Sequence, residues 1–275
     1  MNEIVSYFST IPSSHRSLIL VGGITIFWMI ENTFPLFKFN YKKWNHAGIN
    51  FFLTFTTIII NFVLAFILLR TADWTIENHF GILQWIPEIP LWLYTIIGLL
   101  LLDLIGAYLA HFTEHKIKFL WRFHLIHHTD TWIDTTSGNR HHPGESIIRF
   151  IFTTFGVLIV GSPMWMVFLY QTLSVISTQF THANISLPNK VDTFLSYLIV
   201  SPNMHKVHHH YALPYTDSNY GNIFSIWDRI FGTFTTLPKE NIIYGIDTHM
   251  NPKEHNNLKN LLQIPFQKPR SPKND

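Results

Sequence analysis

One stretch of the chain limits its fold more than any other. Residues Ala47–Leu69 form a run of 23 residues without a charged side chain, and Lys42, Lys43 and Arg70 flank it. A helix rises roughly 1.5 Å per residue, so this run can cross a hydrocarbon core of about 30 Å. Only 13% of the residues are charged, against about 25% in soluble domains. The sequence therefore predicts a membrane-spanning helix and disfavours a soluble protein with buried helices.

Three further runs are long and apolar. Ser17–Phe37 is interrupted by Glu31, and Ile89–Ala110 contains Asp103 as its one charge. Phe150–Thr181 is uncharged, and Gly161-Ser162-Pro163 is expected to turn it into a hairpin. The first arm, about 12–15 residues before the turn, is short for a full crossing and could be re-entrant. We predict an all-α membrane protein with four to five transmembrane helices, the last two a hairpin.

The distribution of basic residues predicts the orientation. If the N-terminus faces outward and the spans alternate, the outer segments contain only Arg16 and Arg70. The other seventeen basic residues then lie inside, as positive-inside topology favours. This arrangement places a helical cap with the clustered histidines on the cytoplasmic face. We expect the inner membrane of a bacterium, or the endoplasmic reticulum in a eukaryote.

Histidine is the unusual component of the composition. Twelve of the seventeen histidines lie between His111 and His210. Eight of these twelve form the patterns HxxxH, HxxHH and HxxHH, and His182 stands separately at the end of the last span. Residues three and four apart share a helix face, so each motif is expected to aim two or three imidazoles at one spot. The chain has no cysteine, which excludes thiolate sites and disulfides, and its net charge of +2 argues against nucleic acid as a partner.

The histidines point to metal binding. Neutral imidazole suits iron, copper, zinc and nickel. Eight or nine histidines exceed the roughly four ligands of one zinc ion. They are about right for two metal ions.

These motifs resemble the fatty acid hydroxylase / sterol desaturase superfamily of integral-membrane di-iron enzymes. The resemblance covers roughly residues 95–235 and extends beyond the histidines to the sequences LWRFHLIHH at 120–128, RHHPGE at 140–145, SPNMH at 201–205 and NYGNIFSIWDRIFGT at 219–233. It implies one integral-membrane domain over residues 1–262, with its histidine core at 95–235, and a flexible tail at 263–275.

The resemblance also implies a set of site residues. The metal ligands would be His111, His115, His124, His127, His128, His182, His205, His208 and His209. Supporting residues around them would be Asp103, Arg140, His142, Glu145, Asn219 and Asp228. For Asp103 we expect a hydrogen bond from a ligand imidazole, the alternative being a bond to a neighbouring span. Thr178 replaces a histidine that some members have, which leaves room for water or another ligand.

The implied activity is hydroxylation or desaturation of a lipid C–H bond. Two iron ions would be the cofactor, with zinc as a substitute in purified protein, and O2 the co-substrate. The lipid would be a sterol, fatty acyl, sphingoid or ether lipid. Electrons would come from a donor such as a cytochrome b5-like protein or a ferredoxin. The basic residues Lys116, Lys118, Arg122 and Lys206 could dock this donor or simply reflect topology.

Two other functions remain open at this point. His111-Phe-Thr-Glu114-His115 matches the HxxEH pattern of zinc hydrolases, in which the glutamate acts as a base. Against this, Lys118 is available to pair with Glu114 one helical turn later. The third possibility is a metal-binding membrane protein without enzymatic activity. For Glu31, pointing towards water and facing the site are equally compatible with the sequence.

Overall fold

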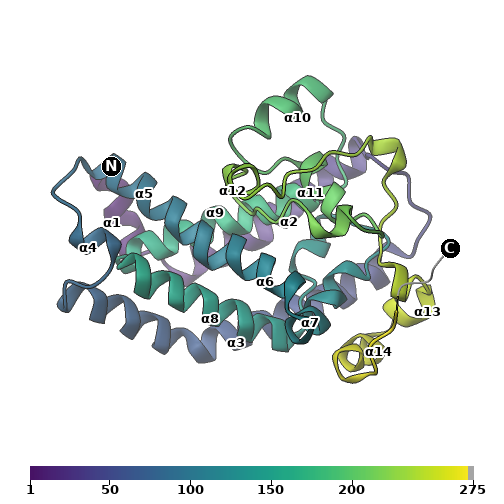
Figure 1. The fold of residues 1–275 in the computed structure, drawn as a ribbon, viewed down its shortest axis with the longest axis horizontal. Helices are drawn as coiled ribbons and strands as arrows, with labels where there is room; N and C mark the ends of the chain where they lie inside the picture. The colour runs from purple at the N-terminus through teal and green to yellow at the C-terminus, as the bar shows by residue number, and fades with distance from the viewer. Residues whose placement is uncertain (272–275) are drawn as a thin grey trace.

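Five long helices form an antiparallel bundle in the computed structural model, which describes residues 1–271 (Figure 1). The third of these is interrupted: α5 continues through a π-helical segment, Leu104–Leu109, into α6. The bundle helices are α2 (Ser13–Thr33), α3 (Lys43–Glu77), α5 (Leu91–Asp103) with α6 (Ala110–Lys116), α8 (Pro143–Val160) and α9 (Met164–His182).

The short helices lie at the two ends of this bundle. Within residues 1–271 the structure contains isolated β-bridges but no strand. The helices outside the bundle are α1 (Asn2–Ser9), α4 (Ile82–Trp85), α7 (Lys118–His128), α10 (Asn189–Leu195), α11 (Pro202–His208), α12 (Ile226–Ile230), α13 (Pro252–His255) and α14 (Leu258–Gln263).

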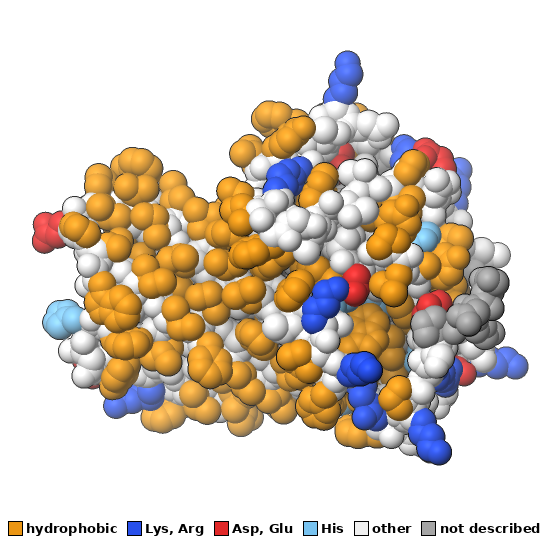
Figure 2. All heavy atoms as spheres, viewed as in Figure 1, with side chains coloured by type: hydrophobic (Ala, Val, Ile, Leu, Met, Phe, Trp, Pro, Cys, Tyr) orange, Lys and Arg blue, Asp and Glu red, His pale blue; other side chains and the backbone are white. Residues whose placement is uncertain are grey.

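Within the described residues 1–271, four helical segments are long and apolar enough to cross a membrane: Ser13–Thr33, Lys43–Trp85, Leu91–Lys116 and Pro143–Val160. Their outer surfaces are apolar, and Phe62 in the middle of α3 is 81% exposed. Figure 2 shows hydrophobic side chains covering this part of the molecule almost continuously. The prediction of an all-α membrane protein is thus confirmed. The fifth bundle helix, α9, is less apolar because it contains Gln171, Ser174 and Gln179.

The predicted hairpin joins α8 to α9. The expectation of a short first arm was wrong, because α8 starts at Pro143 and has 18 residues. The sequence offers a clear start signal there: the side chain of His142 accepts a hydrogen bond from the Gly144 N–H, and proline occupies the first turn. The helix ends at Gly161 in the left-handed conformation.

The packed domain continues beyond the predicted boundary at residue 262. Leu261 and Ile264 are buried and pack with Leu125 and Ile126 of α7 in one hydrophobic cluster. The segment predicted as a flexible tail therefore begins inside the packed structure. Residues 272–275 of that segment lie outside the described part of the chain.

We predict that the Gly161 turn is essential for stability. At a φ of 69°, a β-carbon on residue 161 would lie 2.4 Å from the backbone oxygen of Phe80. Left-handed backbone costs other residues about 1–2 kcal/mol before that clash is counted. Gly161→Ala should lower the thermal unfolding midpoint in detergent by several degrees.

Gly48→Ala is the matched control, because Gly48 is helical and a β-carbon there meets nothing within 4 Å. This change should be neutral or stabilise the protein by up to about 1 kcal/mol. An unchanged midpoint in Gly161→Ala would contradict the role of the turn.

Candidate metal centre

All nine predicted histidine ligands lie together at one end of the bundle, in two adjoining groups of buried side chains. Within each group, one ring nitrogen from every member lies within 4.8 Å of those of the other members. The first group comprises His111, His115, His124, His128 and His208. The second group comprises His127, His182, His205 and His209.

The two HxxHH motifs are divided between the groups. In α7, His124 and His128 belong to the first group and His127 to the second. In α11 and its C-cap His209, His205 and His209 belong to the second group, whereas His208 belongs to the first. Residues four apart thus share a group, and the residue between them faces the other group. The expectation that each motif aims at one spot is corrected: each of these helices lies between the groups and contributes to both.

The nitrogens converge at distances that suit shared ions. In the second group, the Nε2 atoms of His182, His205 and His209 lie 3.1–3.2 Å from one another, and His127 Nε2 is 3.2 Å from His182 Nε2. Imidazoles about 2.0–2.1 Å from one metal ion place their nitrogens roughly 3.0–3.4 Å apart. Three mutually close nitrogens cannot all be satisfied by hydrogen bonds among themselves, because each shared contact needs one proton and one lone pair.

In the first group the convergence also runs through Nε2. His124 Nε2 lies 3.1 Å from His111 Nε2 and 3.2 Å from His128 Nε2. The Nε2 atoms of His115 and His208 are buried and have no hydrogen-bond partner. Buried polar atoms without a partner are rare in native proteins. Metal ions would satisfy these lone pairs.

Five of the nine imidazoles are held by an acceptor at the opposite nitrogen. His111 Nδ1 lies 2.8 Å from the Tyr220 carbonyl oxygen, His208 Nδ1 2.7 Å from that of Ser218, and His182 Nδ1 2.8 Å from that of Thr178. His115 Nδ1 and His124 Nδ1 face carboxylates. Carbonyls and carboxylates accept hydrogen bonds, so they place the proton on Nδ1 and leave the Nε2 lone pair free for a metal.

Burial keeps the histidines outside the spans neutral. Desolvation first, and neighbouring charges second, hold the pKa values of six of them well below the ordinary value for histidine. The six are His124, His127, His128, His205, His208 and His209. A neutral imidazole is the form that binds metal. Both groups therefore have the donor atoms, the protonation state and the spacing of metal sites.

Glu145 is the central carboxylate beside the first group. It accepts hydrogen bonds from Nδ1 of His124 at 2.7 Å and Nδ1 of His141 at 2.7 Å, and Arg149 donates to it at 3.0 Å. Glu145 thus lies beside a clustered histidine, as expected, and contacts that histidine, His124, directly. Neither His141 nor Arg149 was among the predicted site residues, although each lies four residues from Glu145 in the sequence.

Glu114 does not pair with Lys118 as expected. It is buried and forms an ion pair with Arg149 at 2.9 Å, because the helix breaks at Ile117 before Lys118. Its nearest cluster atom is His124 Nδ1 at 3.7 Å, on the side of the ring that faces away from the converging Nε2 atoms. This position argues against a role as the base of a zinc hydrolase.

Asp103 anchors the loop before α12 rather than an imidazole or a neighbouring span. It accepts hydrogen bonds from the backbone N–H groups of Ile223 and Phe224 and from Trp227 Nε1. Our expectation of an imidazole partner is therefore corrected: Asp103 sits at the start of the π-helical segment, too early in the helix to face the cluster.

The side chains of Asn219 and Asp228 fix the same loop through hydrogen bonds to backbone groups. Asp228 accepts hydrogen bonds from the N–H groups of Tyr220 and Gly221 and from the Thr233 hydroxyl. Asn219 has a positive φ and donates to the carbonyls of Met204 and Thr235. These bonds fix the carbonyls of Ser218 and Tyr220 against His208 and His111, so both residues support the site through the backbone.

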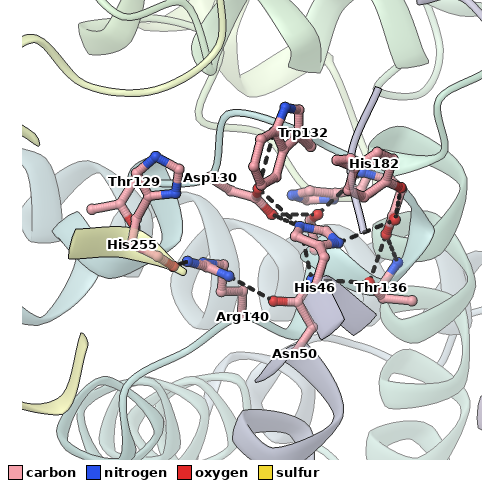
Figure 3. Close-up of polar contacts among 12 residues, drawn as sticks. His46, Asn50, Thr129, Asp130, Trp132, Thr136, Arg140, His182 and His255 are labelled. Carbon is pink, nitrogen blue, oxygen red and sulfur yellow. Dashed lines mark hydrogen bonds and ion pairs between the residues drawn. The ribbon is translucent and has the colours of Figure 1, made fainter. Parts of the chain in front are cut away.

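Arg140 belongs to a buried polar network near His182 of the second group, with contacts drawn in Figure 3. It donates to the Asn50 side chain at 2.9 Å and to the carbonyls of Ile126 and His255. His46 of α3 lies 2.8 Å from Asp130 and 3.3 Å from Asp134. This network ties α3 to the loop after His128, and the sequence analysis missed it because no motif marks His46.

The remaining expected residues lie outside both groups. Glu31 is buried, accepts the N–H groups of Thr135 and Asn184 and pairs with Lys43 at 3.3 Å, so it neither points freely to water nor faces the histidines. His142 caps α8. Lys206 is fully buried and cannot be part of a docking surface.

Asp217 is a further residue that the sequence analysis missed. Its side chain is one-third exposed and lies 3.1 Å from His115 Nδ1 and 2.6 Å from Lys116 Nζ. These partners hold the pKa of Asp217 at about 2, against the opposing effect of partial burial. No spacing rule links Asp217 to His115, since the two residues are 102 positions apart in the sequence.

Comparisons with known proteins agree with the motifs. The ornithine lipid hydroxylase OlsE of Rhizobium tropici is 26% identical over 163 residues, which is 59% of this chain and 47% of that protein. Alkylglycerol monooxygenase of Caenorhabditis elegans is 29% identical, covering 52% of this chain and 28% of that protein. Methylsterol monooxygenase 2-2 of Arabidopsis thaliana is 22% identical, covering 80% of this chain and 82% of that protein.

The first two relatives are matched over less than half of their own length. No solved structure gives a significant match. The model of the family described as fatty acid hydroxylase matches residues 95–233, half of the chain, and this range contains all nine clustered histidines. The chain belongs to the fatty acid hydroxylase family.

Proposed function

We propose that the protein is a membrane-bound di-iron oxygenase that uses O2 and external electrons to hydroxylate a C–H bond of a lipid. The observation that carries this proposal is the pair of adjoining, buried, all-imidazole groups with their Nε2 atoms turned inward. Membership of the fatty acid hydroxylase family and similarity to proteins named as lipid hydroxylases and monooxygenases support it.

Iron fits the donor set and the task. Side-chain acids and bases cannot break an unactivated C–H bond, so a cofactor must supply the hard step. The first group would hold one ion and the second group the other. Iron bound there would supply the chemistry that, with electrons from an external donor, reduces O2 to an oxidant strong enough to attack an alkyl chain. Zinc would be an inactive substitute in purified protein.

The protein's own residues position and insulate this centre. Glu145, Asp217 and the three backbone carbonyls hold five imidazoles in the orientation that presents Nε2. Tyr220 covers the first group: its ring centroid lies 5.0–5.7 Å from those of His111, His115 and His208. These contacts keep water away from the reacting atoms.

A lipid substrate is supported by an apolar groove between α3 and α8 with a volume of about 880 Å³. It extends from Trp74 and Glu77 to Ile147, two residues beyond Glu145. An alkyl chain in this groove would point along the bundle towards the histidine end. The relatives' names make a polar membrane lipid, an ether lipid or a sterol the candidate classes. Desaturation would be the variant outcome of the same hydrogen abstraction.

The electron donor would approach the exposed side of the first group. Lys116 lies there beside Asp217, which contacts His115 directly. A cytochrome b5-like protein or a ferredoxin, both acidic carriers, would suit the positive side chains of Lys116 and Lys118. We propose that this end of the bundle faces the cytoplasm, in a bacterial inner membrane or in the endoplasmic reticulum of a eukaryote.

The first prediction from the proposed function concerns metal content. His209→Asn should reduce bound iron from about two ions per chain towards one, because asparagine reproduces the position of Nδ1 but cannot reach that of Nε2. His210→Asn is the control: His210 lies outside both groups, and its Nδ1 accepts a hydrogen bond from the Ile243 N–H that asparagine can replace. Elemental analysis of the purified proteins tests this, and equal iron in both variants would contradict the assignment.

The second prediction concerns Glu145. Replacing the partner of a metal-binding histidine typically costs 10–100-fold in metal affinity or activity. Glu145→Gln should therefore weaken iron retention during dialysis against a chelator by a factor in that range. Glu88→Gln, the same change at an exposed residue before α5, should have no effect. Equal retention in the two variants would rule out support of His124 by Glu145.

The third prediction concerns the reaction. Lipid extracts of cells that produce the protein should contain species heavier by 16 Da than those of cells without it, or lighter by 2 Da if it desaturates. The shift should require O2 and disappear in His209→Asn while persisting in His210→Asn. Lipid profiles that do not change under aerobic growth would refute a lipid oxygenase.

A further inference from the structure

The short helix α10 is amphipathic in the opposite sense to a helix of a soluble protein. Its buried side carries the polar residues Asp192 and Ser196, whereas Phe194 is 66% exposed and Leu198, just beyond the helix, is 62% exposed. At roughly 100° per residue, Val191, Phe194 and Leu198 fall on one side. In water this arrangement would leave the apolar side uncovered.

The polar side of α10 is hydrogen-bonded to the rest of the protein. Asp192 accepts hydrogen bonds from the Ser201 hydroxyl at 2.9 Å and from the Asn203 N–H at 3.2 Å. These bonds fasten α10 to the start of α11, which carries His205 and His208. The orientation of α10 is thus fixed, and its apolar side cannot rotate inward.

The neighbouring α12 enlarges the apolar surface. Ile226 and Ile230, one helical turn apart, are exposed. The guanidinium of Arg229 lies over the Tyr197 ring at 5.1 Å and connects the two helices. We define the α10 patch as the exposed side chains of Val191, Phe194, Tyr197, Leu198, Ile226 and Ile230.

The patch faces the membrane-spanning part of the molecule. In Figure 1, α10 projects sideways from the histidine end of the bundle, beyond α11 and α12. Figure 2 shows hydrophobic side chains on the flank of this projection that is turned towards the bundle's apolar surface. Lys190 and Arg229, at its edge, are positive charges of the kind that lie among anionic lipid headgroups.

We propose that the α10 patch lies in the interface of the lipid bilayer, with its apolar side chains inserted below the headgroups. A surface of this composition beside membrane-spanning helices matches an interfacial amphipathic segment. Because Asp192 fastens α10 to α11, the same contact would set the depth of the α11 histidines relative to the membrane. This proposal depends on the membrane placement of the chain and is independent of the bound metal.

The absence of cysteine makes a direct test possible. Single variants Phe194→Cys and Leu198→Cys of the full chain are labelled with a nitroxide and reconstituted into vesicles of phosphatidylcholine and phosphatidylglycerol. Collision rates with O2, which concentrates in lipid, and with a water-soluble nickel chelate are then measured by electron paramagnetic resonance. Phe62→Cys in α3 gives the lipid reference, and Lys253→Cys in α13 the aqueous reference.

We expect the ratio of O2 to nickel collisions at residues 194 and 198 to exceed the Lys253→Cys value several-fold and to approach that of Phe62→Cys. Asn189→Cys is the matched control, because Asn189 is exposed, lies roughly 140–180° around the helix from Phe194 and Leu198, and should stay near the aqueous reference. An aqueous ratio at 194 and 198 would overturn the proposal. Low collision rates with both reagents would also overturn it, because they would mean that another protein surface covers the patch.

Discussion

The structure depends on burying nine neutral imidazoles in one place. An imidazole removed from water loses two hydrogen-bonding partners, and the loss is large unless both are replaced. Here the two ring nitrogens are treated differently. In five of the rings, protein acceptors take the place of water at Nδ1, whereas the Nε2 atoms converge on one another. The convergence is unfavourable for the protein alone, and two groups of this geometry could each hold a metal ion.

The acceptors come from parts of the chain that are far apart. The carbonyls of Ser218 and Tyr220 belong to a loop held by Asp103 and Asp228, neither of which contacts an imidazole. Their carboxylates bind backbone N–H groups of residues 220–224 and thereby fix the carbonyls nearby. Asp103 and Asp228 thus support the site indirectly, and a substitution at either should disturb the histidines through the loop.

Much of this could be predicted from the sequence, and the reasons for the failures are physical. Uncharged runs and helical histidine spacing identify the bundle and the histidines that cluster, because both depend on local periodicity. The division of HxxHH between two groups depends on how α7 and α11 lie against each other, which spacing within one helix does not encode. Likewise, Asp217 meets His115 across about one hundred residues of chain. Glu114 pairs with Arg149 rather than Lys118 because Ile117 leaves the helical conformation.

The position of the centre at one end of the bundle follows from the cost of polar groups in lipid. Charged residues at the bilayer centre cost about 2.5–3.5 kcal/mol each by insertion measurements, and this site needs Glu114, Glu145 and Arg149 around its imidazoles. Because these charged residues lie where the helices end, the segments after α6, α9 and α10 can enclose them. The apolar part of the bundle begins beside this position, because the groove between α3 and α8 extends along the helices to Ile147, two residues from Glu145 in the sequence. The end of the bundle therefore combines a protein-enclosed polar site with an apolar surface next to it.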